Sequence, residues 1–187
     1  MQPCLRPLSH PRILGAMFAS PTLIGESFIG SGGEAAHLNV VIGRRGSPVE
    51  TAWASALAAP RAGHIPFVAV LQPGLPVKPF TLFVNKAPVE SERHGTLTWG
   101  AAQAGVASGV ALAVREGLIP VEDADDILII AAVWVNPAAQ DEELVFANNR
   151  DSALGAIRAA VSGEPRAEAV IAAADLPRNP YFRGGRG

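Results

Sequence analysis

Residues 37–50 read HLNVVIGRRGSPVE and contain a strand signal followed at once by a helix signal. From His37 to Ile42, polar-bearing and apolar positions alternate, which is typical of a strand with one buried face. Gly43–Gly46 interrupts this pattern. Ser47 then begins an SxxE capping box with proline at the first helical position, so we expect a helix over Pro48–Ala58. A strand followed directly by a helix indicates the α/β class.

Strand and helix signals alternate along the rest of the chain. Phe67–Leu71 and Phe80–Asn85 are apolar and rich in strand formers, and a Gln-Pro-Gly-Leu-Pro turn separates them. Trp99–Glu116 is a nearly uncharged run of small residues, which indicates a helix that is buried on most faces and packs closely. Ile127–Val135 is continuously apolar, as expected of a strand at the centre of a sheet. An amphipathic helix that starts at Asp151 then ends at Gly163.

The composition is that of one folded domain. The 187 residues are 49% hydrophobic and 17% charged with a net charge of −2, which excludes wholesale disorder and argues against a nucleic-acid partner. No uninterrupted apolar run approaches the roughly 20 residues of a membrane span, so no membrane partner is expected. The single cysteine, Cys4, leaves no intrachain disulfide and favours a reducing, cytoplasmic location. We expect one domain over residues 21–165, between a disordered leader (1–20) and a partly disordered C-terminal extension (166–187).

Three polar residues are candidates for chemistry. The four histidines lack metal-ligand spacing, so no metal is expected. His37 opens a strand after a glycine-rich turn, where it is either a proton-transfer group or an ordinary hydrogen-bonded histidine. Lys86 ends an apolar strand and is either a solvated lysine or a ligand contact. Gln103 lies in the neutral helix, and its amide is satisfied either by a nearby carbonyl or by a ligand.

Longer strings of residues carry a resemblance to a known family. They are GEAAHLNVVIG (33–43), GSPVETA (46–52), LPVKP (75–79), FVNK (83–86), GAAQ (100–103), EGLIP (116–120) and ADD (124–126). Through these strings the chain resembles the formaldehyde-activating enzyme family, without obvious gaps over about residues 24–165. The resemblance implies a hydro-lyase of one-carbon metabolism and methylotrophy. Its reaction would condense formaldehyde with tetrahydromethanopterin, giving methylene-tetrahydromethanopterin and water, with the pterin as co-substrate and no metal.

The resemblance also implies roles for individual residues. His37 would be the general acid that protonates the departing carbinolamine hydroxyl. The implied pterin contacts are Asn39, Val68, Lys86, Pro88 and Gln103. The implied fold is an α+β sandwich of the ribosomal protein S5 domain 2-like kind, assembled as a homopentamer with pterin sites between neighbouring subunits.

Two of these positions depart from the family pattern. Asn39 stands where the family has an aspartate, so a negative charge is replaced by a neutral amide. If the carboxylate favours the imidazolium, its absence lowers the pKa of His37. Pro88 stands where the family usually has threonine, which removes a hydroxyl and a backbone donor. These departures leave open an alternative function, a non-catalytic paralogue that binds or senses a reduced pterin or formaldehyde.

Overall fold

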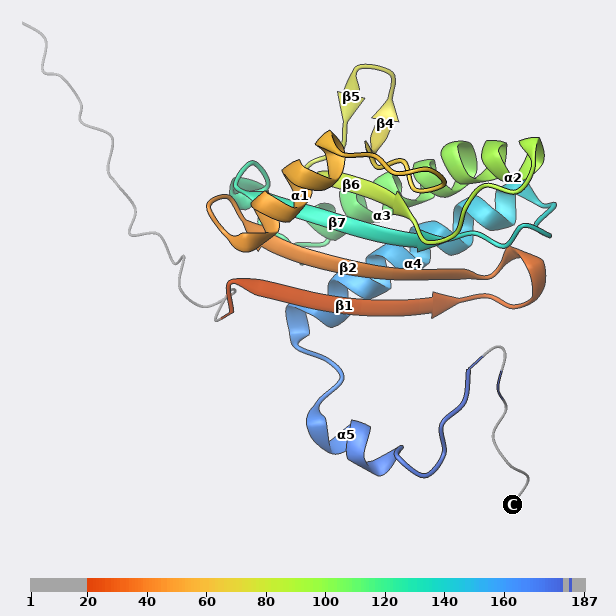
Figure 1. Ribbon diagram of the computed structural model, residues 1–187. Coiled ribbons are helices and arrows are strands. Elements are labelled where there is room, and N and C mark those ends of the chain that lie inside the picture. The colour runs from red at the N-terminus through yellow and green to blue at the C-terminus, as the bar shows by residue number, and fades with distance from the viewer. Residues whose placement is uncertain (1–19, 180–181, 183–187) are drawn as a thin grey trace, which may run out of the picture.

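The computed structural model describes residues 20–179 and 182 and contains a five-stranded sheet in the order β1-β2-β7-β6-β3 (Figure 1). Its strands are β1 (Thr22–Ile29), β2 (Ala36–Arg44), β7 (Ile127–Trp134), β6 (Phe80–Asn85) and β3 (Phe67–Val68). All neighbouring pairs are antiparallel except β6 and β7, which run parallel. A separate hairpin is formed by β4 (Val70–Gln72) and β5 (Leu75–Pro76). The mixed sheet and its helices confirm the single-domain α/β expectation, whereas the S5-like family of the fold stays a prediction.

Helices cover the two faces of this sheet unequally. On one face, α3 (Gln103–Arg115) and α4 (Glu142–Ser162) enclose the main core, while α1 (Pro48–Ala58) lies on the other face, against β2 and β7 (Figure 1). Glycines in the strands allow both contacts, because a Cβ at Gly25 would overlap the backbone of α4 and one at Gly43 would overlap the start of α1. We call the face that carries α1 the outer face. Since α1 lies mainly against β2 and β7, much of the outer face is left open.

The alternating residues of β2 lie on opposite faces of the sheet, as predicted. Leu38, Val40 and Ile42 are buried in the core, and His37 and Asn39 point to the outer face with partial exposure. The predicted helix Pro48–Ala58 is confirmed with the same bounds. Ser47 and Glu50 cap this helix, each one residue away from its partner in an ideal capping box. The Ser47 hydroxyl accepts a hydrogen bond from the Val49 N–H, and the Glu50 carboxylate accepts one from the Gly46 N–H.

One predicted strand is interrupted. The segment expected as a single strand over Phe67–Leu71 divides at Ala69 into β3 and β4. The Ala69 N–H donates to the Thr81 carbonyl, and the Ala69 carbonyl accepts from the Val77 N–H. Ala69 thus links β6 to the β4–β5 hairpin, and the chain leaves the large sheet at this residue.

The neutral helix begins earlier than its composition indicates. A continuous helical run consists of α2 (Glu92–Thr96), the π-helical segment η2 (Leu97–Ala102) and α3. This 24-residue run is long and apolar enough to cross a membrane, since its most apolar 18-residue window has a mean hydropathy of 1.3. However, 61% of that window is buried inside the protein. Gly105 and Gly109 allow its close contact with α4, because a Cβ at either would overlap the α4 backbone. This packing confirms the expected burial on most faces.

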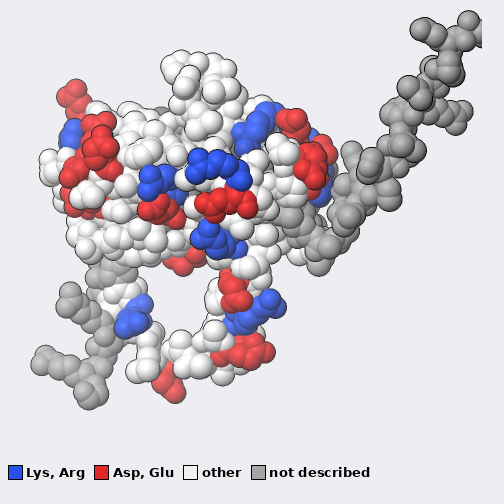
Figure 2. Space-filling model, turned by 180° about the vertical axis from the view of Figure 1, so that it is seen from behind, with Lys and Arg blue, Asp and Glu red and all other residues white. Residues whose placement is uncertain are grey.

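The last predicted helix is longer than expected. It begins nine residues before the predicted start at Asp151, with the carboxylate of Asp141 accepting from the Leu144 N–H, and ends at Gly163 in a left-handed conformation with φ 67°. Acidic and basic side chains are interspersed on the face of the molecule that Figure 2 shows. Arg158 of this helix forms an ion pair with Glu116 at 2.9 Å. Two short 3-10 turns, η1 (Gly32–Glu34) and η3 (Val121–Asp123), complete the domain.

A C-terminal arm follows α4. It contains α5 (Ala167–Ala172), none of whose residues is buried, and it runs below β1 in Figure 1 toward Asn179. The expected leader lies outside the described residues apart from Ser20, as do residues 180–181 and 183–187 of the expected extension. The disorder expected of these two segments stays a prediction.

Candidate active site

A pocket of about 560 Å³ opens on the outer face of the sheet. Phe28, His37 and Trp134 form one row across β1, β2 and β7, since Phe28 and Trp134 are the two cross-strand partners of His37. Lys86 extends the row. It comes directly after Asn85 of β6, whose cross-strand partner Val133 of β7 directly precedes Trp134. The remaining lining residues are Glu26, Arg178 and Asn179. This volume is within the range of small-molecule sites.

His37 is held by a carboxylate at the wall of this pocket. Its Nε2 lies 3.0 Å from Oε1 of Glu26, and its ring centroid lies 5.9 Å from that of Phe28. The side chain of His37 is 38% exposed, so the ring is partly desolvated but open to a ligand. Burial and the nearby Lys86 charge lower the pKa of His37 from its ordinary value, and Glu26 opposes both effects by favouring the charged ring.

Lys86 lies beside the histidine rather than in free solvent. Its backbone N–H donates to the Val133 carbonyl at 2.7 Å, and its Nζ donates to the His37 carbonyl at 3.4 Å. Partial burial lowers the pKa of Lys86, while Glu26 raises it. The loop that carries Lys86 is fixed by Asn85, whose amide donates to the carbonyls of Gly63 and Ala87, each at 2.7 Å. Lys86 is thus half-buried, and both alternatives, a solvated lysine and a ligand contact, stay open.

The other predicted residues on this side of the molecule lie on three different elements. Asn39 shares the outer face with His37 and pairs directly with Glu26 of β1. Pro88 is exposed in the loop that follows Lys86 and packs next to Gly63. Val68 is in the edge strand β3, separated from β2 by β6 and β7. Asn39 and Lys86 are thus grouped with His37, whereas Val68 lies at the far edge of the sheet.

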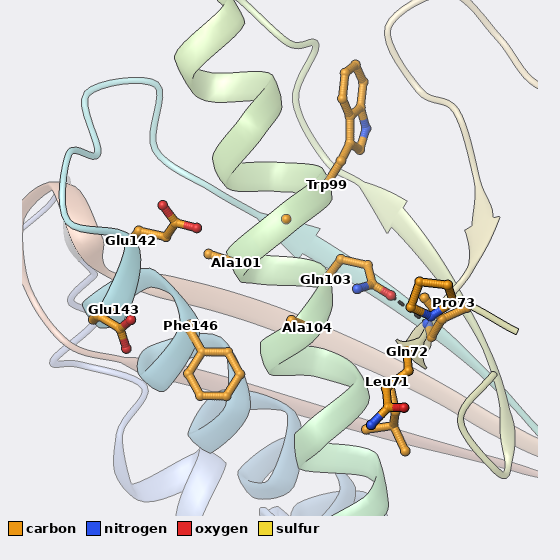
Figure 3. A pocket seen from close by; sticks show the side chains of 12 residues that line it. Leu71, Gln72, Pro73, Trp99, Ala101, Gln103, Ala104, Glu142, Glu143 and Phe146 are labelled. Carbon is orange, nitrogen blue, oxygen red and sulfur yellow. Dashed lines mark hydrogen bonds between the residues drawn. The ribbon is translucent and has the colours of Figure 1, made fainter. Parts of the chain in front are cut away.

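Gln103 lies at a different pocket in the same chain. Its Oε1 accepts a hydrogen bond from the Val70 N–H at 2.5 Å (Figure 3). The residue as a whole is 7% exposed. This second pocket, of about 520 Å³, is formed by α3, the start of α4 and the β4–β5 hairpin, with Trp99 and Phe146 in its wall. A backbone N–H thus bonds the amide oxygen, and the carbonyl or ligand contact expected of the amide stays a prediction. In the described part of the chain, Gln103 and His37 thus line two different pockets.

The other described histidines have structural contacts. His64 Nδ1 lies 2.8 Å from the Asn85 carbonyl. Nδ1 of the buried His94 accepts from the Glu90 N–H, and its Nε2 donates to the Val135 carbonyl at 3.0 Å. His10 lies outside the described residues. Residues 20–179 and 182 contain no group of three or more His, Cys, Asp or Glu that could hold a metal ion, and the metal-free site stays a prediction.

Sequence reasoning missed five residues of the pocket, namely Glu26, Phe28, Trp134, Arg178 and Asn179. Glu26 and Phe28 belong to β1, whose alternation of apolar and polar residues is weak, and they face His37 only because of the β1–β2 register. Trp134 is the last residue of an otherwise aliphatic strand. Arg178 is distant in sequence and approaches the pocket from the C-terminal arm. The register between β1 and β2 is the signal that identifies Glu26, and the sequence analysis predicted no strand over β1.

A carboxylate-held histidine beside a partly buried lysine, in a pocket on an open sheet face, is typical of an enzyme site that transfers protons to a small molecule. Comparison with family models matches residues 24–182 to the formaldehyde-activating enzyme, and the chain belongs to this family. The match continues past residue 165 and includes Arg178 and Asn179 of the arm.

Individual relatives agree with the family match. A protein of Methanosarcina barkeri named 5,6,7,8-tetrahydromethanopterin hydro-lyase is 42% identical over 160 residues, covering 86% of this chain and 90% of the relative. A bifunctional enzyme Fae/Hps of Archaeoglobus fulgidus is 39% identical over 158 residues, covering 84% of this chain and 40% of the relative. Another of the same name, from Methanosarcina mazei, is 38% identical over 148 residues, and the chain spans 38% of its length.

Proposed function

We propose that this chain condenses formaldehyde with tetrahydromethanopterin to form methylene-tetrahydromethanopterin and water. The observation that carries the proposal is His37, which lies in an open pocket with a carboxylate on Nε2 and a lysine beside it. The relative named as the tetrahydromethanopterin hydro-lyase, which this chain matches over 90% of its length, supports the same reaction.

The residues of the pocket account for the step that most needs a catalyst. Addition of one pterin amine to formaldehyde gives a carbinolamine, whose hydroxyl is a poor leaving group. The protonated His37 donates its proton to that oxygen, the C–O bond breaks, and the nitrogen lone pair forms the C=N bond as water leaves. The second amine then adds to the same carbon and releases a proton, which restores His37. The oxygen of formaldehyde leaves in the water, together with one hydrogen from each amine.

We further propose that the pterin site lies between two copies of the chain in a homopentamer. The residues assigned to pterin contact fall into two groups, one around His37 on the outer face and one around Gln103 near α4. One ligand contacts both groups if the outer face of one copy meets the Gln103 pocket of the next. Asn39, Lys86 and Pro88 would hold the pterin from the first side, with Val68 at the sheet edge, and Gln103 from the second.

A cytoplasmic location in methylotrophic one-carbon metabolism is part of the same proposal. The single cysteine supports it, because a chain with one cysteine gains no intrachain disulfide in an oxidising compartment. Localisation of a tagged full-length protein in its own cells tests this part.

The test of the proposed function is the initial rate of methylene-tetrahydromethanopterin formation, followed by absorbance with the spontaneous rate subtracted. We expect the wild type to accelerate the reaction. We expect His37→Ala and His37→Gln to lose the acceleration, the latter because its amide can still contact Glu26 but cannot donate an acidic proton. Binding of the pterin by both variants, measured by calorimetry, should change little.

Two outcomes would contradict the proposal. Equal acceleration by the wild type and His37→Ala would exclude His37 as the acid. Pterin binding by the wild type without any acceleration would favour the alternative of a binding or sensing paralogue.

A further inference from the structure

We propose that Glu26 is the positioning residue for the acid. Its carboxylate holds the His37 ring through Nε2, so that Nδ1 delivers the proton to the substrate. The inference rests on the proposed function of His37, and no role for Glu26 follows from the sequence motifs described above.

The geometry supports this assignment directly. Glu26 Oε1 and His37 Nε2 are 3.0 Å apart, within hydrogen-bond distance. The contact is built into the sheet, because β1 and β2 pair in continuous register from Thr22–Gly43 to Ile29–Ala36. This register places Glu26 opposite Asn39 and therefore diagonal to His37 on the same face. Within the described residues no hydrogen bond of His37 Nδ1 is observed, and with 38% of the side chain exposed this nitrogen is the one left for a ligand.

The charges around His37 give Glu26 a second effect. Lys86 approaches from the end of β6 and Arg178 from the C-terminal arm, so the pocket wall contains two cationic side chains. Phe28 of β1 and Trp134 of β7 are uncharged, and Asn39 of β2 is a neutral amide. Glu26 is therefore the single anionic group among the described residues that line this pocket. It favours the imidazolium against partial burial and against Lys86.

The two ring nitrogens consequently have different tasks. In the imidazolium, Nε2–H donates to Glu26 and Nδ1–H points to the substrate. When the Nδ1 proton passes to the carbinolamine hydroxyl and water leaves, the ring remains neutral with Nε2–H still bonded to Glu26. The proton released by the second amine returns to Nδ1. Glu26 takes up no proton in this cycle, so it acts through His37.

The experiment compares Glu26→Gln and Glu26→Ala with the wild type. Nitrogen NMR of the free protein follows the titration of His37, whose signals are assigned by their loss in His37→Ala. In the neutral wild-type ring we expect the proton on Nε2. Glu26→Gln should keep this tautomer and lower the pKa of His37 by about one unit, because the neutral amide still accepts the hydrogen bond but has no charge. Glu26→Ala should lower the pKa and also lose the tautomer preference.

The rate profile provides the second readout. A general acid is active while protonated, so a lower pKa moves the loss of activity with rising pH to lower pH. We expect the rate of Glu26→Gln to fall up to about tenfold at pH values above the titration and to approach the wild-type rate at acidic pH. Glu116→Gln is the matched control, because it removes the same charge from the exposed Arg158–Glu116 pair between α3 and α4. It should change neither the titration nor the rate profile.

The outcomes separate this inference from the proposed function. If His37→Ala loses acceleration but Glu26→Gln leaves both the titration and the rate profile unchanged, Glu26 has no positioning role and His37 remains the acid. If His37→Ala keeps the acceleration, the proposed function of His37 fails whatever Glu26 does. Should both Glu26 variants fail to fold, the wild-type tautomer still decides, because a proton on Nδ1 of the neutral ring would overturn the inference.

Discussion

Gly105→Ala tests the close contact of α3 and α4, the helix pair next to the Gln103 pocket. A Cβ at Gly105 would come closer than 3.0 Å to the carbonyl oxygen of Phe146, a separation that real Cβ atoms essentially never show. It would also lie 3.0 Å from the backbone nitrogen of Arg150. Both neighbours are helix backbone, which cannot rotate away as a side chain can. The two helices must therefore separate.

The size of the effect follows from two opposing terms. Overpacking of a well-packed core costs about 1–3 kcal/mol, and we expect the upper end here because the obstacle is backbone. Alanine has the higher helix propensity by about 1 kcal/mol, which offsets part of this cost. The expected net loss is about 2 kcal/mol in the free energy of unfolding. For a chain of this length it corresponds to a fall in Tm of about 4–8 °C.

The assay is urea unfolding followed by far-ultraviolet circular dichroism at one fixed protein concentration, since assembly would make stability depend on concentration. Gly100→Ala is the matched control, because a Cβ at this position of the same helical run meets nothing within 4 Å. We expect that variant to be unchanged or more stable by about 0.5–1 kcal/mol. Equal stability of the two variants would refute the reasoning about the α3–α4 contact.

Two further predictions concern the active site. Asn39→Asp adds a negative charge on the His37 face, so we expect the pKa of His37 to rise by about half a unit to one unit, and the loss of activity with pH to move upward. Asn39→Leu should give no upward shift in the His37 titration by NMR, and an unchanged titration in Asn39→Asp would contradict the prediction. Separately, His37→Ala and Gln103→Ala should each be defective alone. The two variants are then mixed in equal amounts, unfolded and refolded together. If a site takes His37 from one copy and Gln103 from the next, about a quarter of the interfaces have both residues and should be active. No recovery in mixed oligomers would contradict a site shared between copies.

Local signals predicted most of the helices and strands. The capping box at Ser47 set the start of α1, and apolar runs located β6 and β7, because these signals depend on neighbouring residues alone. The start of α4 was missed, since Glu142 and Glu143 are polar and the helix there depends on its cap at Asp141. The break at Ala69 was missed because it depends on hydrogen bonds to Thr81 and Val77, which are distant in sequence.

The residues of the active site also fall into those that local sequence signals predicted and those that only the tertiary structure placed. The sequence by itself determined that His37 lies on the polar-bearing face of a strand and that Lys86 ends another, because side-chain direction in a strand follows from alternation. Only the tertiary structure decided that Glu26 meets the His37 ring, since the register between β1 and β2 fixes which residues face each other. It also decided that Gln103 lies at another pocket, because α3 packs on the face of the sheet opposite His37. Alternation gives each strand two faces, and only the packing of the helices decides which of them stays open to a substrate.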